Sequence, residues 1–271
     1  MSSGVARSRK PLSQVAVSAE VLASSALYTS VAVVASTGST NADLLAAARA
    51  GAAAGSVLVA EEQTAGRGRL DRTWLSEPGT ALTFSVLLRP TDVPPAWRGW
   101  LPLLTGVATA VALTGHTAVD VSLKWPNDVL AGSGKLAGIL AEQAGQAIVV
   151  GIGLNVSATR DELPSGQATS LQLAGGRGLD RAAILITILR EFERWYLRWT
   201  RDPRPGDPVA SGLHAAYLSV CTTIGRDVRV ELPGSDVLAG RATGVDECGR
   251  LLVSAADGVH AVSAGDVVHV R

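Results

Sequence analysis

A cluster of charged and flexible residues occupies positions 66–72, where the sequence reads Gly-Arg-Gly-Arg-Leu-Asp-Arg. Arginine carries a planar, permanently charged guanidinium group that matches the geometry of phosphate and carboxylate groups. Glycine allows the backbone to approach a ligand closely. The segment is therefore suited to closing over an anion, with Arg67, Arg69 and Arg72 as its charged groups. A solvated basic loop is the alternative interpretation.

Small polar residues follow an apolar stretch at positions 38–41, where the sequence reads Gly-Ser-Thr-Asn. Leucine and alanine then recur at helical spacing, so we expect a helix capped by Thr40 or Asn41. Hydroxyl groups and free backbone N–H groups at a helix N-terminus suit polar or anionic ligand atoms. The segment predicts a ligand contact, and the alternative is that Ser39 and Thr40 serve only as caps.

A lysine, an amide and a carboxylate lie together at positions 124–128, where the sequence reads Lys-Trp-Pro-Asn-Asp. Apolar residues alternate with polar ones over positions 119–123, as in a strand, and Pro126 ends the pattern. Polar groups just past a strand end are common in active sites, although Asn and Asp are equally common in plain turns. Asn127 and Asp128 are therefore candidate site residues.

Two glycine-containing segments look like nucleotide motifs but do not meet their patterns. Gly134 and Lys135 lack the earlier glycine of a P-loop, since position 129 is Val, and Leu136 stands where Ser or Thr is required. Positions 151–155 lack the third glycine of a dinucleotide fingerprint. Lys135 is instead expected to be a point charge aimed into a cleft. The glycines at 151 and 153 indicate a strand on which a ligand or another backbone packs closely.

Apolar patterns predict the elements that position these segments. Residues 99–119 carry no Asp, Glu, Lys or Arg and are long enough to span a bilayer. Their proline, glycines and threonines favour a helix buried in a soluble core. Strands are expected at 31–34, 57–60, 81–88, 119–123, 136–142 and 147–150, and helices at 19–26, after 41, and at 101–113, 181–200 and 213–218.

Length and composition bound the organisation of the chain. Its 271 residues include 24 Lys plus Arg and 24 Asp plus Glu, and a net charge of zero argues against nucleic-acid binding through bulk positive charge. Two cysteines give no disulfide framework and no zinc quartet, which fits a reducing cytoplasm. We expect a catalytic domain over 1–219, with about 1–18 disordered, and a small antiparallel β-module over 220–271.

In order and spacing, these segments closely resemble the motifs of the biotin protein ligases. The resemblance covers about residues 30–200, and the terminal β-module matches the family's small SH3-like domain. It implies an α+β fold in which a mixed or antiparallel sheet is flanked by helices, as in class II synthetase cores, with a small C-terminal SH3-like β-barrel. The matching segments are residues 38–41, 63–69, 124–128, 134–140 and 151–155.

The resemblance implies a two-step reaction. The carboxylate of biotin attacks the α-phosphate of Mg²⁺-bound ATP, giving biotinyl-5′-AMP and pyrophosphate. A lysine of a biotin carboxyl carrier domain, in an acyl-CoA or pyruvate carboxylase, then attacks the mixed anhydride and releases AMP. The implied protein is a cytoplasmic monomer or weak homodimer that binds neither DNA nor a membrane. Only about 30 residues precede the first core strand, too few for the family's DNA-binding domain.

The family pattern also implies individual roles. Lys135 is the main catalytic residue, and Arg67 and Arg69 act with it over biotin and the phosphates. Asp128 is expected to orient Mg²⁺ or to accept the proton of the incoming lysine, whose free pKa is about 10.4. Biotin contacts are implied for Ser39, Thr40, Gln63, Gly66, Arg67, Lys135, Gly138, Gly151 and Gly153. Contacts with ATP or the adenylate are implied for Arg69, Arg72, Asn127, Lys135, Asn155 and Trp74, which would stack near adenine.

Three other functions compete with this one. A lipoate–protein ligase shares the core fold and the adenylation chemistry, but the Gly-Arg-Gly-Arg and Lys-Trp-Pro-Asn-Asp segments favour biotin. A non-catalytic biotin or adenylate sensor would have lost charged motif positions, and all of them are present. A DNA-binding regulator lacks its helical reader domain in this sequence.

Overall fold

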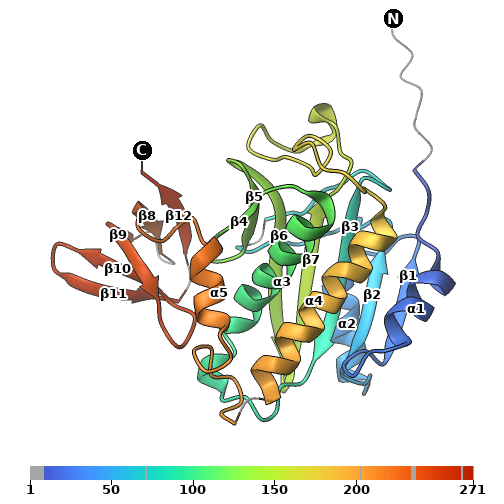
Figure 1. Ribbon diagram of the computed structural model, residues 1–271, viewed down its shortest axis with the longest axis horizontal. Helices are drawn as coiled ribbons and strands as arrows, with labels where there is room; N and C mark the ends of the chain where they lie inside the picture. The colour runs from blue at the N-terminus through green and yellow to red at the C-terminus, as the bar shows by residue number, and fades with distance from the viewer. Residues whose placement is uncertain (1–8, 71, 202, 233–235, 264, 271) are drawn as a thin grey trace, which may run out of the picture.

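The structure, a computed structural model, describes residues 9–70, 72–201, 203–232, 236–263 and 265–270. Within these residues, seven strands form one central sheet (Figure 1). The β1 and β2 strands are parallel, and every other neighbouring pair is antiparallel, so the expected mixed sheet is confirmed. In spatial order the strands are β1 (Ser30–Val34), β2 (Ser56–Ala60), β3 (Ala81–Leu88), β7 (Ala147–Asn155), β6 (Gly134–Ala144), β5 (Asp128–Ala131) and β4 (Val121–Lys124).

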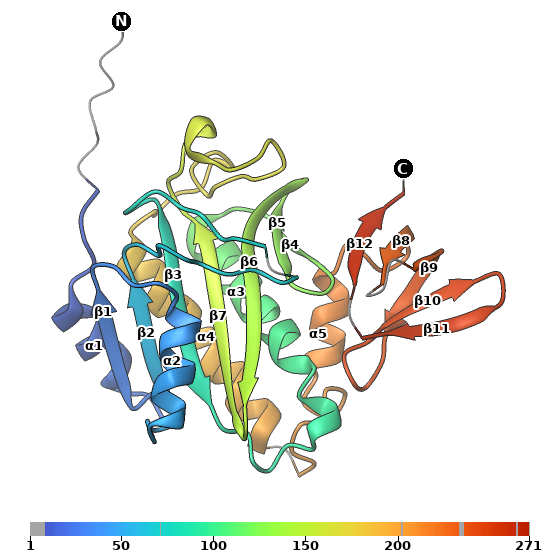
Figure 2. The same cartoon turned by 180° about the vertical axis from the view of Figure 1, so that it is seen from behind.

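Helices cover both faces of this sheet (Figures 1 and 2). The long helices α3 (Trp100–Thr117) and α4 (Arg181–Arg201) lie on one face, and α1 (Gln14–Leu22) packs beside β1 and α4. The α2 helix (Thr40–Arg49) lies on the opposite face, where its leucines pack against β3 and β7. Every residue of β3 is buried, because this strand is covered on both sides.

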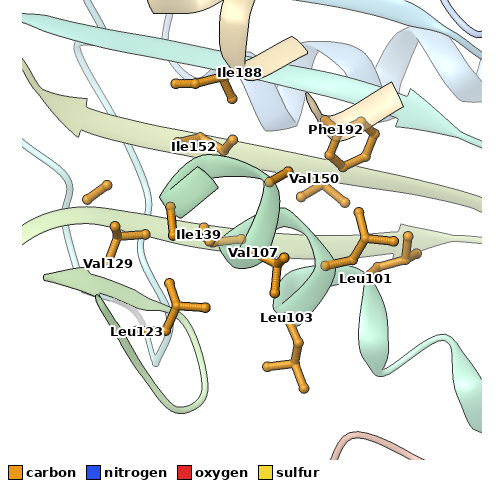
Figure 3. Close-up of a cluster of buried hydrophobic side chains, with 14 of the residues drawn as sticks. Leu101, Leu103, Val107, Leu123, Val129, Ile139, Val150, Ile152, Ile188 and Phe192 are labelled. Atoms are coloured by element: carbon orange, nitrogen blue, oxygen red, sulfur yellow. The ribbon is translucent and has the colours of Figure 1, made fainter. Parts of the chain in front are cut away.

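The face under α3 and α4 forms the main hydrophobic core (Figure 3). Val107 of α3 and Phe192 of α4 pack in it with Ile139, Val150 and Ile152 of the sheet. Successive strand residues point to opposite faces, so the neighbours of these apolar residues face α2. The α3 helix is buried along most of its length, as expected for residues 99–119. Among the described residues, no helix is long and apolar enough to cross a membrane.

In the described part of the C-terminal region, five antiparallel strands form a second sheet. This sheet stands where the small SH3-like β-barrel was expected, and its outer strands, β11 and β12, are not paired with each other among the described residues. The strands in spatial order are β11 (Gly258–Val262), β10 (Leu251–Ala255), β9 (Val237–Val245), β8 (Asp227–Glu231) and β12 (Asp266–His269). The α5 helix (Leu213–Val220) leads into this sheet and packs on α3.

Hydrogen bonds join the second sheet to the large domain next to positions 124–128. The indole nitrogen of Trp100 donates to the carbonyl oxygen of Glu247 at 2.9 Å. The indole nitrogen of Trp125 donates to the carbonyl oxygen of Gly249 at 3.1 Å. Both tryptophans are fully buried, and their N–H groups require such partners. The turn between β9 and β10 is therefore fixed against the segment that carries Asn127 and Asp128.

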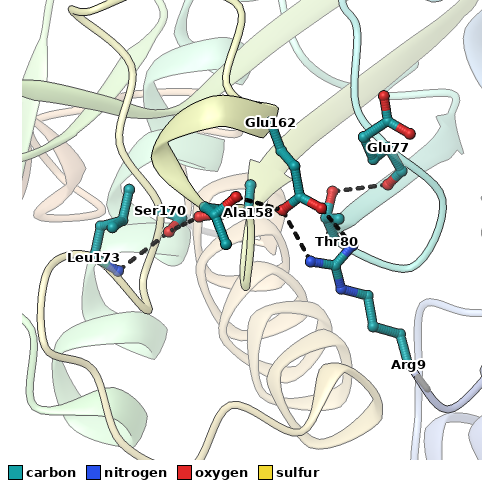
Figure 4. Close-up of polar contacts among 8 residues, drawn as sticks. Arg9, Glu77, Thr80, Ala158, Glu162, Ser170 and Leu173 are labelled. Atoms are coloured by element: carbon teal, nitrogen blue, oxygen red, sulfur yellow. Dashed lines mark hydrogen bonds and ion pairs between the residues drawn. The ribbon is translucent and has the colours of Figure 1, made fainter. Parts of the chain in front are cut away.

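The N-terminal segment differs from its prediction. Residues 1–8 lie outside the described residues, and α1 spans Gln14–Leu22 instead of 19–26. The side chain of Ser13 caps α1, and Val17 and Val21 are buried. Arg9 makes a bidentate ion pair with Glu162, in the short 3-10 helix Arg160–Glu162 (Figure 4). These contacts with distant residues order a segment whose composition alone suggests disorder.

Candidate active site

A cavity of about 310 Å³ lies on the α2 face of the sheet. The structure brings together at it nearly all of the residues that the sequence predicted for the site. Of the predicted residues, it is lined by Ser39, Thr40, Gln63, Arg67, Arg69, Arg72, Trp74, Asn127, Asp128, Lys135, Gly138, Gly151 and Gly153. Asn155 instead lines an adjoining cavity of about 650 Å³, which shares Lys135 and Asp128 with the first. Gly66 is buried in the loop behind Arg67 and lines neither.

Glycines form the floor of this cavity. Gly138 of β6 and Gly153 of β7 are paired in register, and Gly151 lies two residues from Gly153 on the same face. These positions carry no side chain, which leaves a shallow space on an otherwise filled sheet. A Cβ atom on Gly153 would lie 2.3 Å from the ring of Trp74, and one on Gly151 would lie 2.2 Å from Asn41 Oδ1. Any side chain at either position would displace its neighbour.

Trp74 covers the part of the floor predicted to contact biotin. Its ring also lies 3.5 Å from the Cβ position of Gly138. The indole nitrogen is buried and has no hydrogen-bond partner among the described residues. Stacking of Trp74 on adenine therefore remains a prediction, and a ligand on the glycine floor requires the indole ring to move or to pack beside it.

Lys135 and Asp128 form an ion pair at the edge of the floor. The Lys135 Nζ atom lies 2.6 Å from Asp128 Oδ1. Backbone hydrogen bonds tie Lys135 to residues 167 and 169, and Asp128 opens β5 directly after the Trp125–Pro126 turn. About 37% of the lysine side chain is exposed, so its charge faces the cavity instead of the core.

The three predicted arginines have separate acidic or polar partners. The guanidinium group of Arg67 lies 3.4 Å from the Glu142 carboxylate. Arg69 donates to Asn127 Oδ1 at 3.2 Å. Arg72 forms an ion pair with Asp266 of β12. Burial lowers the pKa of Arg69, and the nearby Asp266 and Asp128 carboxylates oppose this effect. An arginine nevertheless remains charged at physiological pH. The loop thus presents three cations around the cavity.

The N-terminus of α2 supplies the hydroxyl groups of the site. Ser39 is the N-cap of α2, with a long 3.5 Å contact to the backbone N–H of Ala42, so the prediction of Thr40 or Asn41 as cap is wrong. Thr40 and Asn41 already lie in the helix and point toward the sheet. The backbone N–H of Thr40 donates to Gln63 Oε1 at 2.8 Å, which places Gln63 beside the hydroxyls.

Several site residues were missed by the sequence reasoning. Asn41, Gln167 and Asp266 line the cavity, and Ser85 and Glu142 bond to its lining residues. Polar residues inside an apolar strand pattern were the available signal for Ser85. Asp266 had no signal, because it comes from the distant β-module.

A Mg²⁺ ion was expected together with ATP. Among the described residues, no group of three or more His, Cys, Asp or Glu side chains is placed to hold a metal ion. Mg²⁺ usually uses one or two carboxylates together with the phosphates of the nucleotide. The single carboxylate of Asp128 fits such a role only in part, because one of its oxygens is paired with Lys135.

Comparisons with known proteins identify the family of this chain. Residues 30–157 match the biotin/lipoate A/B protein ligase family, and residues 223–270 match the biotin protein ligase C-terminal domain. The chain is 44% identical to the biotin–[acetyl-CoA-carboxylase] ligase of Mycobacterium tuberculosis, over 98% of each protein. It is 33% identical to the bifunctional ligase/repressor BirA of Escherichia coli, over 80% of this chain and 67% of that protein.

A solved structure shows a similar overall fold. The biotin protein ligase from Aquifex aeolicus in complex with biotin and ATP has a TM-score of 0.75 and 29% identity, covering 90% of this chain and 100% of that chain. The fold and the site thus define a protein ligase of the biotin/lipoate class. Within this class, the chain belongs to the biotin protein ligases, and the resemblance read from its motifs is confirmed.

Proposed function

We propose that this enzyme activates biotin as biotinyl-5′-AMP and transfers it to a lysine of a biotin carboxyl carrier domain. The observation that carries this proposal is the convergence of Lys135, Asp128 and the loop arginines on one cavity with a glycine floor. The relative that is 44% identical is named for biotin transfer to acetyl-CoA carboxylase. The carrier domains of acyl-CoA or pyruvate carboxylases are the proposed acceptors.

In the first step, a carboxylate oxygen of biotin bonds to the α-phosphorus of ATP and the bond to pyrophosphate breaks. Two anions must approach each other, so negative charge builds up between them. That charge is stabilised by the ammonium group of Lys135 and by the guanidinium groups of Arg67 and Arg69. Arg72, Asn127 and Asn155 are proposed to hold the nucleotide.

In the second step, a neutral lysine amine attacks the carbonyl carbon of the anhydride, and AMP leaves with the bonding electrons. The amine must lose a proton. Asp128 lines both adjoining cavities and accepts that proton in our proposal. Its contact with Lys135 also orients the catalytic ammonium group.

Mg²⁺ is proposed to enter with the ATP phosphates and to neutralise part of their charge. The expected absence of DNA binding, the cytoplasmic location and the monomeric or weakly dimeric state remain predictions. A lipoate ligase is the second candidate in the same fold. The glycine floor flanked by the Ser39 and Thr40 hydroxyls favours a polar ring such as the ureido ring of biotin.

Transfer of radiolabelled biotin tests the proposal. With ATP and Mg²⁺, the purified enzyme should label a biotin carboxyl carrier domain and leave unlabelled a matched domain whose acceptor lysine is replaced by arginine. Lipoate should not be transferred at a comparable rate. Transfer of lipoate but not biotin would overturn the proposal in favour of the second candidate.

A further inference from the structure

The chain between β7 and α4 includes a loop, residues 157–170, that holds the backbone of Lys135. The Lys135 N–H group donates to the Gln167 carbonyl oxygen at 2.7 Å, and the Lys135 carbonyl oxygen accepts from the Thr169 N–H group at 2.8 Å. The 157–170 loop therefore borders both Lys135 and the adjoining cavity of about 650 Å³. The loop residues that line this cavity are Pro164, Ser165, Gln167 and Ala168.

The first part of this loop is the short 3-10 helix Arg160–Glu162, which is tied to the part that lines the cavity. The Glu162 carboxylate accepts hydrogen bonds from the backbone N–H of Thr159 at 2.9 Å and from its hydroxyl group at 3.0 Å. The Arg160 side chain donates to the Ala168 carbonyl oxygen at 2.7 Å. The position of Glu162 is therefore coupled through these bonds to the backbone that borders the cavity.

Arg9 contacts this loop from the other end of the chain. Its two terminal nitrogens donate to the two Glu162 carboxylate oxygens at 3.0 and 2.9 Å (Figure 4). The two side chains are only 27% and 28% exposed. Arg9 also packs on Gly79, where a Cβ atom would lie 2.9 Å from the Arg9 Cβ atom. Gly79 follows residues 73–75, which line the same cavity, so Arg9 contacts the chain on both sides of it.

The backbone next to Arg9 is itself anchored. Arg181, which is buried, donates to the Lys10 carbonyl oxygen at 2.8 Å. The Leu12 N–H group donates to the Glu61 carboxylate at 2.5 Å, and Glu61 also pairs with Arg181 at 2.7 Å. A side chain on a backbone that is already fixed loses less conformational entropy when it forms an ion pair. The anchored backbone therefore favours formation of the contact between Arg9 and Glu162.

We propose that Arg9 is a positioning residue that, through Glu162, holds the 157–170 loop in place beside Lys135 for nucleotide binding. Arg9 lines neither cavity, so it acts on the site only through the loop. The inference rests on the proposed function, in which Asn155, a residue of the same cavity wall, holds the nucleotide. A pair that served stability alone would lower the melting temperature and leave the KM for ATP unchanged.

Steady-state pyrophosphate release at saturating biotin separates these two roles. Arg9→Gln should raise the KM for ATP about three- to five-fold, because the loop is then in place for only a fraction of the time and the nucleotide must order it. The kcat should not change, since the loop is ordered once ATP saturates the enzyme. The dissociation constant for biotin should also stay the same, because the sheet and not the loop forms the glycine floor.

Two further variants connect the effect to the ion pair. Arg9→Lys keeps the charge but cannot form the bidentate contact, so its KM for ATP should lie between those of the wild type and Arg9→Gln. The double variant Arg9→Gln, Glu162→Gln should be no worse than the more severe single variant, because both changes remove the same contact. Fully additive effects would contradict a role through Glu162.

Hydrogen–deuterium exchange without ligand follows the loop independently of activity. In Arg9→Gln the backbone amides of the 157–170 loop should exchange about three- to five-fold faster, while those of β3 keep the wild-type rate. Arg190→Gln is the matched control, since it breaks another arginine pair between the N-terminal region and the large domain, with Glu20 of α1. It should change neither the loop exchange nor the KM for ATP.

The outcomes distinguish this inference from the proposed function. A wild-type KM for ATP in Arg9→Gln, wild-type exchange of its loop, or equal changes in Arg190→Gln would overturn the inference. Absence of biotin-dependent pyrophosphate release by the wild-type enzyme would instead contradict the proposed function. The exchange experiment would then still decide whether Arg9 holds the loop.

Discussion

The ammonium group of Lys135 combines a specific partner with access to the cavity. Asp128 lies 2.6 Å away, and backbone bonds to residues 167 and 169 hold the strand on which the lysine is placed. A preorganised cation costs no rearrangement when charge develops in the transition state. The same reasoning applies to Arg69, which is held by Asn127.

Removal of the Lys135 ammonium group should greatly lower the rate of adenylate formation. We expect Lys135→Ala to slow biotin-dependent pyrophosphate release by about 100-fold or more, because a preorganised charge-stabilising group is lost. The melting temperature should stay close to that of the wild type. Lys10→Ala, which removes a lysine charge outside the cavity-lining set, is the control and should retain full activity. Pyrophosphate release at the wild-type rate by Lys135→Ala would remove the lysine from its proposed role.

Trp74 should report ligand binding. Its ring rests on Gly138 and Gly153, so biotin on the floor must change its surroundings. We expect the intrinsic fluorescence of the wild-type enzyme to change on addition of biotin and most of this change to disappear in Trp74→Phe. Trp97→Phe replaces a tryptophan of the 3-10 helix Pro95–Trp97, outside the lining residues, and should keep the response. An identical response in both variants would place the biotin site elsewhere.

At the scale of elements, the arginine loop is held between β6 and the C-terminal sheet. Arg67 contacts Glu142 of β6, and Arg72 contacts Asp266 of β12. Val267 and Val268 of β12 also line the cavity. The C-terminal sheet therefore contributes a wall to the site.

The effect of the Arg72–Asp266 ion pair on ATP binding can be measured separately from its effect on protein stability. About 65% of the Arg72 side chain is exposed, and exposed ion pairs contribute at most about 1 kcal/mol to unfolding free energy. We expect Arg72→Ala and Asp266→Ala each to raise the KM for ATP several-fold, with the double variant no worse than the more severe single one. Arg190→Ala breaks a similarly exposed pair with Glu20 and should leave this KM unchanged. Fully additive effects in steady-state kinetics would show that the two residues act separately.

At the scale of the whole molecule, segments distant in sequence close around the large domain. Arg9 at the N-terminal end pairs with Glu162, and Arg181 of α4 donates to Glu61 and to the carbonyl oxygen of Lys10 (Figure 4 shows the first pair). The second sheet is joined to the large domain through the hydrogen bond from the Trp100 indole nitrogen to the Glu247 carbonyl oxygen. These contacts turn two peripheral segments into parts of one structure.

The Arg9–Glu162 pair gives stability a defined dependence on pH. Hydrogen bonds from Arg9, together with the backbone of Thr159, lower the pKa of Glu162 from 4.5 to about 2. The folded state then binds fewer protons than the unfolded state, so the stabilisation is complete above pH 4.5 and is lost as the pH falls toward 2. Because the pair is partly exposed, it should contribute only about 1 kcal/mol.

Glu162→Gln should remove that part of the pH dependence. Chemical denaturation between pH 5 and pH 3 should show a smaller loss of unfolding free energy than in the wild type. Glu191→Gln, in a pair within the α4 helix, serves as the control for removal of one partly exposed carboxylate. Equal slopes for the wild type and Glu162→Gln would show that the pair does not form in solution.

The residues themselves determined much of this protein. Alternation of apolar and polar residues placed most strands within a few positions, since a side chain's face follows from a two-residue period. The segments around Thr40, Arg67, Asn127 and Lys135 predicted the family and most of the cavity lining, because each combines a turn with groups that suit an anion. Local chemistry at these positions needs no knowledge of distant partners.

Tertiary structure alone decided the features that depend on residues far apart in the chain. The order of α1 depends on packing against β1 and α4, and the C-terminal sheet depends on which edges pair. Ser39 caps α2, whereas Thr40 and Asn41 lie inside the helix. Their polar groups form hydrogen bonds with Gln63, Ser85 and Glu142. Buried polar groups must form hydrogen bonds with whichever groups the fold places beside them. A local sequence pattern does not show which distant residues those partners will be.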